Sequence, residues 1–164
     1  MKKTLYVLIL CTLTLVLTRC GLKPAGANEL VNPPASGNRV SVYIFSAPWC
    51  AECNRELPAL KEKYLSELST EQQSRVSVAV YVVTGKTAGQ VATQEVADEY
   101  GKSLNLPFTM VADKYYKIYR QYFEDGNAIP AAVLLDNSKQ VLQLYEPGNT
   151  DLDDLFAKIK NSIN

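Results

Sequence analysis

The sequence predicts an α/β domain: a mixed β-sheet with helices on both faces, preceded by an export segment. Three observations support this prediction. Strand patterns alternate with helical patterns through most of residues 39–164, two strand patterns near the C-terminus are joined by a short turn, and residues 1–20 form a separate apolar segment. Strands separated by helices are expected to be parallel, whereas strands joined by a short turn are antiparallel.

The first strand and the first helix surround a cysteine motif. Residues 39–45, "RVSVYIF", are β-branched and aromatic, as expected for a buried strand. A helix is predicted to start near Cys50, and Pro58 should kink it. Its apolar stripe at spacings of three and four consists of Leu57, Leu60, Tyr64 and Leu68.

The middle of the domain adds two strands and a helix. Residues 75–83, "RVSVAVYVV", are almost continuously apolar, which is typical of a central parallel strand covered on both faces. Residues 88–103 are predicted to be helical. Residues 108–113 then form a short strand. The predicted inward side of the helix consists of Ala92, Val96 and Tyr100.

The last third contains a hairpin between two helical segments. Residues 114–123 are predicted to form a short aromatic helix, and residues 130–136 form another buried strand. Residues 140–146 follow a short turn and pair with that strand. The last helix is expected to begin at Asn149 or Thr150, with acidic residues in its first turn.

The composition is that of a soluble globular domain. The chain has 164 residues, of which 47% are hydrophobic and 21% are charged. Lys plus Arg and Asp plus Glu both number 17, so the formal net charge is zero. Because no block of like charge stands out, a nucleic-acid partner is not expected.

Residues 1–20 resemble a signal segment. Lys2 and Lys3 precede an apolar run at 5–17. That run is shorter than the roughly 20 residues of a membrane-spanning helix and within the usual length of a signal-peptide core. The sequence therefore predicts export.

The end of this segment leaves three alternatives open. "LTRC" at 17–20 resembles a lipobox and favours lipidation at Cys20, although Arg19 stands where a small residue is usual. Residues 25–27, "AGA", offer a rival cleavage site, and an uncleaved anchor is the third alternative. Residues 21–38 are rich in Gly, Pro, Ala and Asn and are expected to form a flexible tether to the membrane.

Cys50 and Cys53 stand three positions apart, after the first predicted strand. A zinc site needs about four ligands, and the domain offers two cysteines and no histidine, so no metal is expected. A structural disulfide is the main alternative, but a C-x-x-C bridge closes a very small loop and constrains the unfolded chain little. A helix N-terminus favours a thiolate at Cys50, which makes a redox pair the preferred interpretation.

The motif and its surroundings resemble the thioredoxin fold. W-C-x-x-C after a strand, a proline five residues past the second cysteine, and Ile129-Pro130 opening a later strand all match it. "WCAECNRELPAL" also resembles the TlpA/ResA-like envelope thioredoxins, many of which are membrane-tethered. The likeness covers residues 39–164.

The resemblance implies roles for six residues. Cys50 matches the attacking cysteine and Cys53 the resolving one, and together they form the redox-active disulfide. Glu56 matches an acid near the thiols, although a solvated helix glutamate is an equal alternative. The cis-proline and the two residues that line the site are Pro130, Trp49 and Ile129.

The sequence also departs from the family. Ile44 occupies the position of the buried aspartate of thioredoxins, which leaves Glu56 to handle protons. Residues 124–128 form a longer approach to the cis-proline. The tyrosines of residues 114–123 could line a partner groove, although packing against the sheet is preferred. A peroxidase of the same fold is not favoured, because its Thr and Arg pattern is not visible.

The sequence thus predicts an exported, membrane-tethered thiol–disulfide oxidoreductase that needs no bound cofactor. Its expected partners are proteins with thiols or disulfides and a thiol electron donor. Negative charge at Glu52 and Glu56 favours the reducing direction. The alternative from another class is a binding module in which Cys50–Cys53 is an inert disulfide.

Overall fold

The computed structural model describes residues 39–124, 128–148 and 150–163. The predicted signal segment 1–20, with Cys20, and the predicted tether 21–38 lie outside these described residues. Within the described residues, no helix combines the length and apolarity needed to cross a membrane. The element bounds are β1 Val40–Ser46, α1 Ala51–Glu67, α2 Thr70–Gln73, β2 Val76–Val82, α3 Gln94–Ser103, β3 Thr109–Ala112, η1 Lys114–Tyr116, η2 Tyr119–Gln121, β4 Ala131–Leu135, β5 Val141–Tyr145 and α4 Leu152–Ile163.

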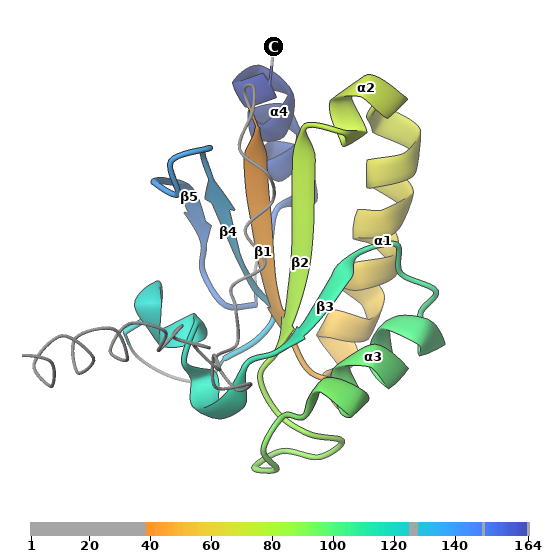
Figure 1. The fold of residues 1–164 in the computed structure, drawn as a ribbon, viewed down its shortest axis with the longest axis vertical. Helices are drawn as coiled ribbons and strands as arrows, with labels where there is room; N and C mark the ends of the chain where they lie inside the picture. The colour runs from red at the N-terminus through yellow and green to blue at the C-terminus, as the bar shows by residue number, and fades with distance from the viewer. Residues whose placement is uncertain (1–38, 125–127, 149, 164) are drawn as a thin grey trace, which may run out of the picture. The chain divides into compact units, whose positions relative to one another are not determined.

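The strands form one five-stranded sheet in the order β3-β2-β1-β4-β5 (Figure 1). β1 pairs in parallel with β2, and β2 with β3, whereas β4 pairs antiparallel with both β1 and β5. The prediction of a mixed sheet is therefore confirmed. β1 is central and almost entirely buried, which explains its unbroken run of β-branched and aromatic residues.

Helices cover the two faces of the sheet unequally. Apolar side chains of α1, α3 and α4 pack with the inward residues of the strands in one hydrophobic core. Ile44, which stands where thioredoxins have a buried aspartate, belongs to this core and is only 1% exposed. The other face is covered by an aromatic cluster and by the short helices η1 and η2.

The prediction of one helix over residues 114–123 is wrong, because that segment forms the two short 3-10 helices instead. Tyr115 and Tyr116 have positive φ angles of 61° and 58°, which an α-helix cannot contain. The buried Asp113 carboxylate accepts hydrogen bonds from the backbone N–H groups of Ile118 and Tyr119 at 2.8 and 2.9 Å. In a continuous α-helix, these two N–H groups would donate to backbone carbonyls. Here they donate to the Asp113 side chain instead, which interrupts the helical hydrogen-bond pattern. Tyr119 is fully buried, as packing predicted, and Tyr115 is 69% exposed.

Other helices begin later than predicted. α3 begins at Gln94 instead of 88, where the Thr93 hydroxyl accepts a hydrogen bond from the N–H of Val96. Ala92 is buried as expected but belongs to the preceding loop, and Val96 is only half-buried. α4 begins at Leu152, after the Asp151 carboxylate accepts from the N–H of Asp154. A helix N-terminus forms where a side chain can satisfy its free N–H groups.

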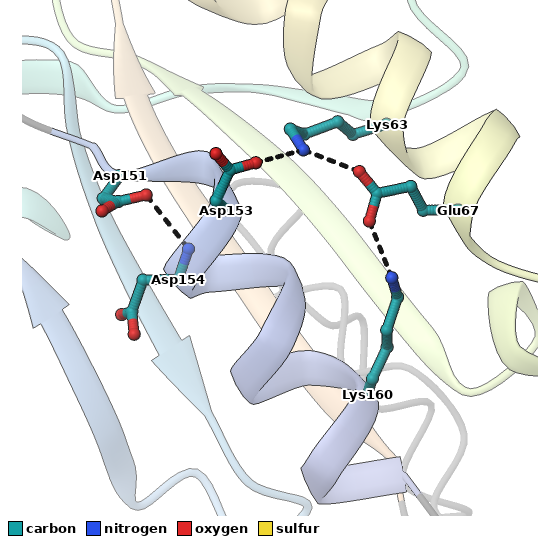
Figure 2. A network of polar contacts seen from close by, with 6 residues as sticks. All are labelled: Lys63, Glu67, Asp151, Asp153, Asp154 and Lys160. Atoms are coloured by element: carbon teal, nitrogen blue, oxygen red, sulfur yellow. Dashed lines mark hydrogen bonds and ion pairs between the residues drawn. The ribbon is translucent and has the colours of Figure 1, made fainter.

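α1 runs without a break past Pro58. Its C-terminal half is tied to α4 by an ion-pair network (Figure 2). The Lys63 ammonium contacts the carboxylates of Glu67 at 2.6 Å and Asp153 at 2.5 Å, and Lys160 reaches Glu67 at 2.7 Å. Tyr64 also packs edge-on against Phe108 at 5.4 Å between ring centroids. These contacts hold the helix whose other end carries the cysteines.

Candidate active site

The cysteine pair lies where β1 passes into α1. Cys50 is the N-cap residue of α1, and its sulfur accepts a hydrogen bond from the backbone N–H of Cys53 at 3.1 Å. The two residues form a disulfide with a Cα–Cα distance of 5.2 Å. Cys50 is 6% exposed and Cys53 is fully buried. Cys50 is therefore the sulfur that a partner can reach, and the N–H groups of the first helical turn face it.

A second segment closes over the disulfide from the sheet. The Ile129–Pro130 peptide bond is cis, and the Ile129 carbonyl oxygen lies 3.8 Å from the Cys50 sulfur. The Tyr119 hydroxyl donates to the Ala128 carbonyl at 2.9 Å, and the N–H of Gly148 donates to the Pro130 carbonyl at 2.7 Å. This segment is therefore held on both sides of the residue that faces the sulfur.

Trp49 forms the outer edge of the site. Its side chain is 43% exposed, and its indole N–H donates to the buried Thr84 hydroxyl at 2.7 Å. Thr84 is the second residue after the end of β2, so the ring is held beside the end of the neighbouring strand. The residue before the disulfide thus presents an apolar surface to solvent in a fixed orientation.

Glu56 lies on α1 one turn after Cys53. Its side chain is half-buried, and its Oε1 atom is buried without a hydrogen-bond partner in the described part of the chain. Burial raises the pKa of the Glu56 carboxyl from its ordinary 4.5 to about 7. Glu56 is therefore partly shielded from solvent, as an acid close to the thiols would be.

A chain of polar contacts behind the motif had no signal in the sequence. The Tyr100 hydroxyl donates to the Asn54 side-chain carbonyl at 2.7 Å and lies 3.2 Å from the Ser46 hydroxyl. The Asn54 side-chain amide donates to the Pro48 carbonyl at 3.0 Å. This relay joins β1, α1 and α3 around the cysteines. The inward position of Tyr100 was predictable from helical periodicity, but its partner on another helix was not.

A family model described as the AhpC/TSA family matches residues 23–144. The chain belongs to the AhpC/TSA family. No curated protein matched the chain significantly.

Solved structures of other proteins share the fold of this AhpC/TSA-family protein. A secreted Mycobacterium tuberculosis disulfide oxidoreductase homologous to E. coli DsbE is 20% identical, with a TM-score of 0.55 over 75% of this chain and 81% of that one. StoA from Bacillus subtilis is 20% identical, with a TM-score of 0.54 over 73% and 81%. A thioredoxin-like protein from Aeropyrum pernix is 20% identical, with a TM-score of 0.56 over 77% and 79%.

The family and the thioredoxin-like fold predicted from the motif are confirmed. Together with the Cys50–Cys53 disulfide, they identify this AhpC/TSA-family protein as a thioredoxin-like thiol–disulfide oxidoreductase. Its partners are accordingly proteins that carry thiols or disulfides.

Proposed function

We propose that the protein is an exported, membrane-tethered oxidoreductase that reduces protein disulfides through Cys50. The observation that carries this proposal is the geometry of the disulfide: Cys50 is its more exposed sulfur, at the N-terminus of α1 and 3.8 Å from the Ile129 carbonyl. Trp49, Ile129 and Pro130 shape the surface on which the partner sulfur arrives.

The proposed reaction transfers two electrons from the reduced cysteine pair to a client disulfide. The Cys50 thiolate attacks one client sulfur, the client disulfide breaks, and the departing client sulfur takes a proton. Cys53 then loses its proton and attacks the sulfur of Cys50 in the mixed disulfide. The second client thiol leaves, the Cys50–Cys53 bond forms, and a thiol donor later reduces the pair.

Glu56 is proposed to accept the proton that Cys53 must lose. Its raised pKa of about 7 suits a group that gives and takes protons near neutral pH. Cys53 and Glu56 are three residues apart on α1, a spacing that places side chains on one helix face. Since Ile44 packs in the core, the first strand offers no competing acid near the motif.

The reducing direction follows from the cost of forming thiolates at this site. Burial of both cysteines and the carboxyl of Glu56 disfavour negative charge there. Glu52 adds less, because it is paired with Arg55 at the surface. Destabilising the reduced pair lowers its reduction potential, so we expect a value near or below about −270 mV.

Equilibration with glutathione buffers tests both the redox activity and its direction. The pair should be almost entirely oxidised at a poise of about −200 mV and reducible by stronger dithiols. A pair that is mostly reduced at that poise would reverse the proposed direction. A disulfide that resists strong dithiols would instead favour the inert binding module.

Residues 1–20 are proposed to be the export signal, and Cys20 is proposed to be the lipidated residue. Residues 21–38 would then tether the domain 39–164 to the membrane. The secreted state of the Mycobacterium tuberculosis relative supports an extracytoplasmic location. The parent should fractionate with membranes, and Cys20→Ser should release it or block its processing. A Cys20→Ser protein that stays membrane-bound with unchanged mass would exclude lipidation.

A further inference from the structure

A groove lies between α3 and the start of α1, the helix that carries the cysteines. Its volume of about 430 Å³ lies in the range of roughly 300–1,000 Å³ typical of ligand sites. It therefore has room for more than one side chain. The sulfur chemistry described above does not use this groove. The lining residues are Pro48, Asn54, Lys86, Val96, Glu99, Tyr100, Ser103 and Leu104.

Two of the lining residues flank the cysteine motif in the sequence. Pro48 stands two residues before Cys50, and Asn54 directly follows Cys53. Two residues of extended chain span at most about 7 Å. A client whose sulfur is bonded to Cys50 thus brings the residues two or three positions from its own cysteine to this groove.

The chemistry of the walls favours a neutral, apolar occupant. Pro48, Val96 and Leu104 contribute apolar surface. The two charged lining residues form an ion pair with each other, since the Lys86 ammonium lies 2.7 Å from the Glu99 carboxylate. A charged client side chain would find no unpaired opposite charge among these residues, whereas an apolar one loses contact with water.

The groove is also held in a fixed shape. The Tyr100 hydroxyl bonds to Asn54 across the two helices, and Asn54 bonds to the Pro48 carbonyl, so three lining residues are joined. The Ser103 hydroxyl donates to the Tyr100 carbonyl at 2.8 Å. Preformed walls reduce the ordering cost of binding, so a short client segment can gain affinity here.

We propose that this groove is a client-specificity subsite that takes an apolar side chain located two or three residues from the client cysteine. The proposal rests on the proposed function, because it requires a client sulfur at Cys50. It assigns recognition to α1 and α3, separately from the Ile129–Pro130 segment that faces the sulfur.

Two disulfide-linked peptides that differ at one position provide the test. One carries Leu two residues from its cysteine and the other carries Ser there. The parent, the groove variant Val96→Phe and the matched control Lys102→Phe are each reduced with dithiothreitol and mixed with both peptides. Lys102 is exposed on α3 and does not line the groove. The rate at which dithiothreitol reduces the Cys50–Cys53 disulfide measures the reactivity of the cysteines alone, because this small reagent has no side chain that could occupy the groove.

The parent and Lys102→Phe should reduce the Leu peptide about tenfold faster than the Ser peptide. Val96→Phe fills the groove and should lose most of this preference while its dithiothreitol reaction is unchanged. Val96→Asp places an unpaired charge on the same wall and provides a second variant if the ring prevents folding. Equal rates for both peptides with the parent, or an undiminished preference in the folded groove variants, would overturn the subsite. A parent that reduces neither peptide would instead contradict the proposed function.

Discussion

The two ends of α1 treat charge in opposite ways. At the C-terminal end, Lys63 and Glu67 are joined to α4 by ion pairs, and the carboxylates of Glu67 and Asp153 both have cationic partners (Figure 2). Toward the N-terminal end, Glu56 is half-buried, and its Oε1 atom has no hydrogen-bond partner among the residues that the structure describes. One helix thus carries a compensated, partly exposed network and an uncompensated, partly buried acid.

The difference appears in the pKa values. The ammonium groups of Lys160 and Lys63 lower the pKa of Glu67, whereas burial raises the pKa of Glu56 to about 7. A carboxyl whose pKa is lowered by folding stabilises the folded state at pH values above its ordinary pKa. A carboxyl whose pKa is raised by folding destabilises the folded state at those pH values. The network therefore supports the helix at neutral pH, whereas the partly buried Glu56 carboxyl reduces the stability of the folded state there.

The largest expected effect lies at the disulfide. Cys50→Ser should lower disulfide-reducing turnover by at least about 10³-fold, the scale of loss when a nucleophile is removed. Cys53→Ser should instead accumulate a mixed disulfide on Cys50, because nothing resolves it. Turnover of an insulin-type disulfide substrate and intact mass measure both. Adducts that form on Cys53 in Cys50→Ser, with turnover retained, would reverse the assigned roles.

The second effect concerns thiolate formation. Glu56→Gln removes a negative charge near the thiols, so the pH midpoint of Cys50 alkylation should fall by at least about half a pH unit. Alkylation of the reduced protein with iodoacetamide from pH 5 to 9 measures it. Glu67→Gln, at the other end of the helix, is the matched control and should keep the parent's midpoint. Superimposable curves for Glu56→Gln and the parent would remove Glu56 from the mechanism.

The third effect is the pH dependence of stability. The folded state holds the Glu56 proton up to about pH 7, whereas the unfolded state releases it near the ordinary pKa of 4.5. Stability should therefore fall as the pH rises through this window, by about 3–6 °C in Tm. Thermal unfolding of the oxidised protein at pH 5 and pH 8 should show this decrease in the parent and little of it in Glu56→Gln. An equal decrease in both proteins would place its origin elsewhere.

The smallest effect should come from the ion-pair end. Glu67→Gln removes the carboxylate shared by Lys63 and Lys160, but ion pairs near the surface contribute little, so Tm should fall by no more than about 3 °C at neutral pH. The loss of Tm should be smaller in 1 M salt, which screens the ion pairs. It should also be smaller as the pH falls below 4.5, because protonation of Glu67 in the parent then removes the same charge. A large change in Tm or in turnover would show that this network supports the active site.

The local sequence determined the strands, the cysteine turn and the α1 stripe. Alternating and continuous apolar runs predicted β1, β2, β4 and β5, because burial on one or both faces demands those patterns. The cis-proline and the role of Glu56 were expected only from the family resemblance. Tertiary contacts decided the rest. The Asp113 carboxylate replaced the predicted helix 114–123, and packing of α1 buried Glu56 and raised its pKa. The hydrogen bond between Tyr100 and Asn54 joined α3 to α1 through two residues that lie 46 positions apart in the sequence. Local patterns reveal which residues avoid water, whereas hydrogen-bond partners and desolvation depend on segments that only the folded chain brings together.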